Sequence, residues 1–149
     1  MAVRTNYVAA SPEVYQAMLA LEEKVGGLGI APTLLHLIKL RASQINGCAF
    51  CIDLHNREAR ADGESQQRLD TLSVWRETRF FDEREQAALA WTEALTRVAD
   101  THAPDADYEA LAAQFDERER VNISLAIVAI NGWNRLAIGF RAPVRRARD

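Results

Sequence analysis

The chain has 149 residues, which suffice for one domain with its own hydrophobic core. Its composition, 48% hydrophobic and 26% charged with 25 alanines, excludes an intrinsically disordered chain and favours helices. The formal net charge is −3 and the one concentrated basic stretch is residues 141–149, so we expect no nucleic-acid partner. No run of about 18 apolar residues predicts a membrane span, and the start of the chain lacks the apolar stretch of a secretory signal. We therefore expect a cytoplasmic protein with no membrane partner.

Apolar residues recur at helical spacing along the chain, and capping residues separate the segments. Ser11-Pro12 provides an N-cap followed by a first-turn proline. Asn46-Gly47 ends a helix, because both residues tolerate the left-handed conformation. Asp82 has a glutamate three residues later and begins another helix with a capping box, while Asp105 and Asp116 are N-caps of the last two. The expected helices span residues 11–26, 32–46, 48–62, 64–72, 82–98, 105–115 and 116–138.

These patterns predict an all-α fold in a single domain over residues 1–149, because no repeat or linker divides the chain. We expect the arginine-rich tail, residues 141–149, to be a solvated and flexible end. The last helix is apolar almost all round between Ile123 and Ile130, which predicts a central core helix or one buried against another subunit. A charge at Ile127 should then disrupt assembly.

The segment from Cys48 to His55 carries the chemistry. At about 100° per residue, Cys48, Cys51 and His55 fall within about 60° of one another on one helix face. Cys51 and His55 stand four residues apart, the spacing at which helical side chains meet, so the imidazole can take the thiol proton. The first turn of a helix also favours an anion. Cys51 is therefore the candidate thiolate, and Cys48 can attack a sulfenic acid on Cys51 to close a disulfide.

A second histidine, His36, is expected at the same depth of a helix pair as His55. If the two helices joined at Asn46-Gly47 form an antiparallel pair, His36 lies about 15 Å before the turn and His55 about 12 Å after it. His36 could then hydrogen-bond His55, directly or through a water, and relay its proton.

Other interpretations of these residues stay open at this point. Cys48, Cys51, His55 and His36 form a ligand set that could hold zinc in a zinc-stabilised helical binding module. The cysteines could be inert core residues of a helical oligomerisation protein. The pair could also serve a dithiol oxidoreductase or a redox sensor with little peroxidase turnover.

The stretch from Leu40 to His55, LRASQINGCAFCIDLH, resembles the signature of the AhpD-like alkylhydroperoxidases in the carboxymuconolactone decarboxylase family. The resemblance continues through residues 88–96 and 122–136. It implies an AhpD-like helical bundle that forms homotrimers or hexamers, with no metal or organic cofactor. It also implies that Cys51 takes the peroxide, that Cys48 resolves it and that His55 assists.

Two positions depart from the family signature. The characterised alkylhydroperoxidase has a relay glutamate where this chain has His36. It also has a histidine between the cysteines, where this chain has Phe50. Because a histidine supplies no permanent negative charge, His55 should be less strongly activated. We expect a thiol-dependent peroxidase that reduces hydroperoxides through a dithiol/disulfide cycle, with catalytic residues Cys51, Cys48, His55 and His36. A lipoyl- or thioredoxin-type protein would fit as its thiol reductant.

Overall fold

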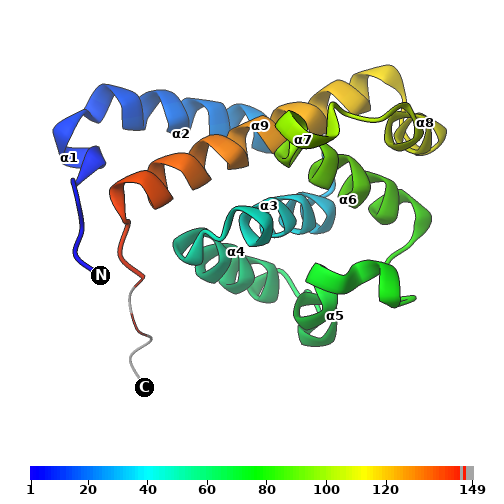
Figure 1. Cartoon of the computed structure of the whole chain (residues 1–149), viewed down its shortest axis with the longest axis horizontal. Coiled ribbons are helices and arrows are strands. Elements are labelled where there is room, and N and C mark those ends of the chain that lie inside the picture. Colours follow the sequence, from blue (N-terminus) through cyan, green and yellow to red (C-terminus); the bar gives the residue numbers. More distant parts are fainter. Residues whose placement is uncertain (145, 147–149) are drawn as a thin grey trace.

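A computed structural model describes residues 1–144 and 146, and these residues form an all-helical fold (Figure 1). The elements are α1 (Tyr7–Ala10), α2 (Pro12–Gly26), α3 (Pro32–Asn46), α4 (Ala49–Ala61), α5 (Gln66–Thr71), the 3₁₀ helix η1 (Leu72–Glu77), α6 (Glu83–Thr96), α7 (Val98–Thr101), α8 (Asp105–Gln114) and α9 (Glu117–Phe140).

Most predicted helix ends are confirmed, and most of the capping residues that predicted them form the expected caps. Asp82 and Asp116 both form full capping boxes, in which the side chain accepts from a backbone N–H and a glutamate reaches back. The α8 prediction was off by one residue, since Pro104 is the N-cap and Asp105 already lies inside the helix. The sequence analysis also missed the short elements α1, η1 and α7, because a single turn leaves too few residues to show a period.

Helices α3 and α4 pack against each other as the predicted hairpin, and α3 also packs against α6 and α9. Gly47 makes the turn with a left-handed backbone of φ 71°. A polar network fixes the turn from the side of α9. The Asn46 side-chain amide donates to Asn131 at 2.9 Å and to Asn134 at 2.8 Å, and Asn134 donates to the hydroxyl of Ser43. The residue before the turn is therefore tied to the central helix.

Helix α3 lies at the centre of the core. Leu37, Ile38 and Leu40 are fully buried on different sides of it. Ile38 belongs to a cluster with residues of α6 and α9, whereas Leu37 and Leu40 belong to a cluster with residues of α4, η1 and α6. Because α3 is packed on several sides, the α4 helix that follows it is held on a rigid support.

Helix α9 is long and apolar enough to cross a membrane by length and composition alone, contrary to the sequence expectation. Its apolar residues are nevertheless used inside the domain, because Ile123, Ile127 and Ile130 are all 1% exposed. Ile127 packs within its own subunit, so a charge there should destabilise the fold itself, and its expected effect on assembly stays a prediction. The apolar face that α9 leaves exposed carries Val121 and Val128 instead.

The N-terminal residues and the end of α9 lie near the start of α4 (Figure 1). The backbone N–H and the guanidinium of Arg4 donate to the carbonyls of Phe140 and Gly139 at the end of α9. After α9, Ala142 packs against the two cysteines. The predicted flexible tail falls partly on residues 145 and 147–149, which lie outside the described residues.

Candidate active site

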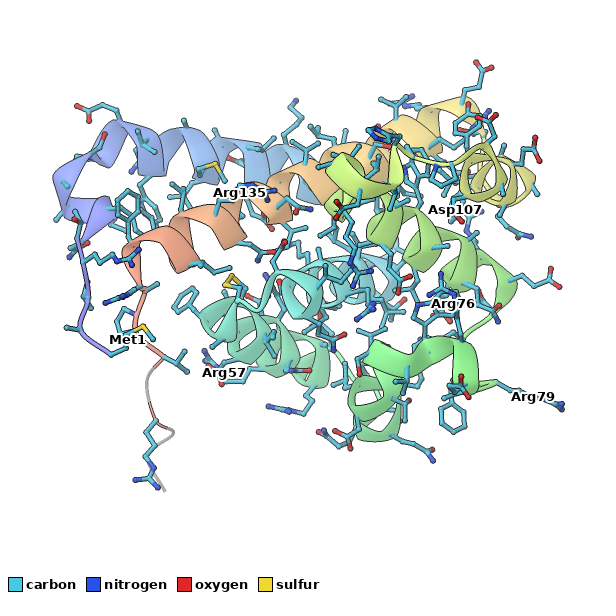
Figure 2. All side chains as sticks on the ribbon, in the orientation of Figure 1. Met1, Arg57, Arg76, Arg79, Asp107 and Arg135 are labelled. Atoms are coloured by element: carbon cyan, nitrogen blue, oxygen red, sulfur yellow. A yellow bond between two sulfur atoms is a disulfide. The ribbon has the colours of Figure 1, made fainter. Side chains whose placement is uncertain are left out.

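The two cysteines form a disulfide at the start of α4, drawn as a yellow bond in Figure 2. Their Cα atoms are 5.3 Å apart, and the side chains are almost fully buried, with exposed fractions of 1% for Cys48 and 3% for Cys51. Cys48 is the N-cap of α4, and its Sγ accepts the backbone N–H of Cys51 at 3.3 Å. Both sulfurs therefore lie at the positive end of a helix, which favours a thiolate when the bond is reduced.

His55 lies one turn after Cys51, and only 7% of it is exposed. Its Nδ1 is hydrogen-bonded to Oε2 of Glu58 at 2.8 Å. This hydrogen bond lowers the pKa of Glu58 below its ordinary value, and the nearby charges of Lys39 and His36 act in the same direction. An ionised carboxylate can only accept, so Nδ1 of His55 carries the proton and Nε2 is left as the proton acceptor.

His36 lies on α3 but does not form the predicted direct hydrogen bond with His55. Its Nε2 instead pairs with Oδ2 of Asp62 at 2.6 Å, at the end of α4. Its Nδ1 is buried without a hydrogen-bond partner among the described residues. Each histidine therefore has its own carboxylate, and the structure brings His55 together with Glu58 rather than with His36.

The acidic partners belong to one stripe of α4. Counting about 100° per residue from Cys51, the residues His55, Glu58 and Asp62 all return to within about 40° of the cysteine. Glu58 is the functional residue that the sequence analysis missed. Its position three residues after His55 was the available signal, because residues three apart on a helix are neighbours.

A pocket of about 330 Å³ opens beside Cys51 and His55. We call it the Cys51 pocket. It is lined by Tyr7, Val8, Tyr15, Leu19, Glu22, Lys39, Phe50, Cys51, Leu54, His55, Glu58, Trp133 and Ala137. Most of this wall is aromatic or aliphatic, so the pocket fits an organic molecule with a small polar group directed at the sulfur.

The charged groups in the pocket wall compensate one another. Glu22 of α2 accepts hydrogen bonds from the Lys39 ammonium and, at 3.1 Å, from the indole N–H of Trp133. Burial raises the pKa of the Tyr7 hydroxyl, and the neighbouring Tyr15 adds to this, so Tyr7 is an uncharged phenol at neutral pH. Trp133 is part of the pocket wall and is held there by its bond to Glu22.

The proposed zinc ligands are not assembled as a set. Cys48 and Cys51 are bonded to each other, and His36 faces Asp62 rather than His55. Among the described residues, no group of three or more His, Cys, Asp or Glu side chains is placed to hold a metal ion.

Comparison with known proteins decides the family. The model of the carboxymuconolactone decarboxylase family matches residues 12–94. The uncharacterized protein YdfG of Bacillus subtilis is 39% identical over 138 residues, which are 93% of this chain and 94% of YdfG. The chain belongs to the carboxymuconolactone decarboxylase family. The resemblance predicted from the Cys-x-x-Cys segment is thereby confirmed.

Solved structures place the chain in the AhpD-like group of the carboxymuconolactone decarboxylase family. A protein of unknown function from Agrobacterium tumefaciens, suggested to be the antioxidant defence protein AhpD, is 51% identical with a TM-score of 0.94, covering 97% of this chain and 100% of that one. An uncharacterized peroxidase-related protein of Ralstonia eutropha JMP134, described as an alkylhydroperoxidase AhpD core, shares the fold at 20% identity with a TM-score of 0.81, covering 93% of this chain and 74% of its own. The debrominase Bmp8 shares it at 19% identity with a TM-score of 0.83 and the same coverage.

Proposed function

We propose that the protein is a thiol-dependent peroxidase that reduces hydroperoxides in the Cys51 pocket. The observation that carries this proposal is a disulfide beside a buried histidine that is itself held by a carboxylate, at the edge of an apolar pocket. A cytosolic location and a thiol reductant complete the proposal, because the cycle needs a source of electrons and a reducing compartment.

In the reduced protein, Nε2 of His55 takes the proton of the Cys51 thiol, and Glu58 stabilises the imidazolium that results. The Cys51 thiolate attacks the terminal oxygen of the hydroperoxide. The O–O bond breaks, Cys51 becomes a sulfenic acid, and the leaving alkoxide takes the proton from His55 and departs as an alcohol.

The Cys48 sulfur then attacks the Cys51 sulfur. The S–O bond breaks, water leaves with the proton of the Cys48 thiol, and the disulfide forms. Two further thiols must supply two electrons and two protons to restore the dithiol. The Cα distance of 5.3 Å lies within the ordinary range for a disulfide, so the helix start accommodates the oxidised state.

The apolar wall of the Cys51 pocket supports an organic hydroperoxide as the substrate rather than hydrogen peroxide alone. Peroxide consumption by the reduced protein with dithiothreitol tests the function, using cumene hydroperoxide and hydrogen peroxide in parallel. We expect turnover with both, a higher rate with cumene hydroperoxide, and no turnover by Cys51→Ser. Oxidation of the thiols without turnover under any reductant would instead leave a dithiol oxidoreductase or redox sensor.

A further inference from the structure

The disulfide is reached by two separate cavities, one at each sulfur. Cys51 lines the Cys51 pocket, and Cys48 does not. Cys48 lines a second cavity of about 480 Å³, and Cys51 does not. We call the second one the Cys48 cavity. It is lined by Met1, Gly47, Cys48, Ala49, Phe50, Ala137, Ile138, Arg141, Ala142, Pro143 and Val144.

Phe50 and Ala137 line both cavities and therefore form the wall between them. Phe50 lies between the two cysteines in the sequence, and Ala137 packs directly against both of them. A molecule in one cavity thus meets one sulfur and is separated from the other by these two side chains.

We propose that the reductant enters by the Cys48 cavity and attacks the sulfur of Cys48, so that oxidant and reductant use opposite sides of the disulfide. This inference rests on the proposed function, because it takes the disulfide as the oxidised state of the catalytic cycle. A thiolate must approach the attacked sulfur from the side away from the leaving sulfur. The Cys48 cavity lies against Cys48 alone, which fits this approach, whereas the Cys51 pocket does not contact Cys48.

Reduction of the Cys48–Cys51 disulfide proceeds as an ordinary thiol–disulfide exchange. The reductant thiolate forms a bond to Sγ of Cys48, the Cys48–Cys51 bond breaks, and Cys51 leaves as a thiolate. A second thiol then attacks the mixed disulfide, which oxidises the reductant by two electrons and releases Cys48 as a thiolate that takes a proton from water. The leaving thiolate is released next to His55, in the pocket where it meets the next peroxide.

The cavity lining indicates the kind of thiol that fits. Its described side chains are apolar apart from Arg141, and the Cys48 sulfur at its base is only 1% exposed. The reacting thiolate must therefore belong to a small molecule or stand on a narrow arm, because a broad protein surface cannot reach the sulfur.

Mapping of the mixed disulfide tests the proposal on the wild-type protein. Oxidised protein is mixed with 2-mercaptoethanol, the freed thiol is blocked at once with iodoacetamide, and fragment-ion mass spectrometry locates each group. We expect mercaptoethanol on Cys48 and the alkyl group on Cys51. The opposite placement would overturn the proposal.

Matched tryptophan substitutions test the two routes separately. Ile138 and Leu19 are both partly exposed, and each lines only one cavity, the Cys48 cavity for Ile138 and the Cys51 pocket for Leu19. Ile138→Trp should slow reduction by dithiothreitol roughly tenfold or more, because exchange depends on access to the attacked sulfur. Leu19→Trp should instead slow oxidation of the dithiol by cumene hydroperoxide. Val98→Trp, at the exposed start of α7 and in neither cavity, should change neither rate.

The two half-reactions are measured apart, reduction without peroxide and oxidation without reductant, so the outcomes separate the claims. If no peroxide oxidised the dithiol, the proposed peroxidase function would be refuted. The route of the reductant would still be tested by the rate at which the disulfide is reduced. The proposal that oxidant and reductant use opposite sides would be overturned if Ile138→Trp slowed both half-reactions equally. It would also be overturned if Leu19→Trp slowed reduction and Ile138→Trp did not. Circular dichroism verifies that each variant retains the helical fold.

Discussion

Replacing Glu58 by glutamine tests which carboxylate activates His55. The amide keeps the shape and can still accept from Nδ1 of His55, 2.8 Å from the carboxylate oxygen, but it removes the negative charge. The imidazolium that forms when Cys51 loses its proton would then lack its counter-charge. Glu58→Gln should therefore lower the thiolate fraction of Cys51 at neutral pH.

The size of the effect follows from the distance and from solvent screening. Two unit charges about 4 Å apart interact by about 1 kcal/mol in water and about 4 kcal/mol at an effective dielectric constant of about 20. Because 46% of the Glu58 side chain is exposed, the lower part of this range applies. A loss of about 1–2 kcal/mol corresponds to roughly 5- to 30-fold slower thiolate chemistry.

Alkylation of Cys51 by iodoacetamide, followed against pH in a reduced Cys48→Ser background, measures the effect. The matched control is Asp62→Asn, which removes the carboxylate from His36 on the same helix without touching His55. We expect Asp62→Asn and His36→Ala to leave the profile within about twofold of the parent, because neither variant removes the hydrogen-bond partner of His55. A larger effect of these variants than of Glu58→Gln would refute the reasoning and restore His36 as the relay.

Three other expectations follow from the structure. After one equivalent of peroxide, dimedone should label Cys51 in Cys48→Ser and nothing in Cys51→Ser; a label on Cys48 in the latter would reverse the assigned roles. Glu93→Ala should lower the free energy of unfolding in urea by about 3 kcal/mol or more, because it leaves the buried Arg41 guanidinium and the Trp75 indole N–H unpaired. A loss under about 1 kcal/mol would contradict this expectation. In the wild type, acidification through the lowered pKa of Glu93 should remove part of the same stability. If the exposed face of α9 carries the expected homotrimer or hexamer interface, Val128→Glu should reduce the mass in light scattering and leave the subunit folded. Ile127→Glu should instead unfold the subunit. An unchanged mass for Val128→Glu would exclude this face as the interface.

The Glu93 prediction rests on a buried cluster that joins three elements. Burial by itself would raise the pKa of Glu93, but hydrogen bonds from Arg76, Arg41 and Trp75 outweigh it and the pKa is lowered. Arg41 and Trp75 donate to one carboxylate oxygen at 2.8 and 2.9 Å, and Arg76, labelled in Figure 2, donates to the other at 2.5 Å. Glu93 is thus ionised in the folded protein, and its contribution to stability is present above the ordinary carboxyl pKa and lost as the pH falls below it.

Local sequence signals were sufficient for the main helices. The capping boxes at Asp82 and Asp116 and the glycine at position 47 act through their nearest neighbours in the chain, so their meaning does not depend on the rest of the fold. The common face of Cys51 and His55 could be predicted for the same reason, because it needs only the geometry of one helix.

The remainder of the site depends on contacts between distant segments. Tyr7, Trp133 and Leu19 come from α1, α9 and α2, and nothing in their local sequence indicates that they meet at one pocket. His36 was expected level with His55 in the α3–α4 hairpin, but its hydrogen-bond partner is Asp62 at the end of α4. Depth along a helix predicts proximity, and it does not determine which hydrogen bond forms.

Titration of free thiols before and after one equivalent of cumene hydroperoxide tests the central claim most directly. The proposed cycle predicts two titratable thiols in the reduced wild-type protein and none after the peroxide, with one alcohol formed for each disulfide closed. Dithiothreitol should then restore both thiols. Retention of both thiols in folded protein after the peroxide, with no alcohol formed, would contradict the assignment of Cys51, Cys48 and His55 as a peroxidase site.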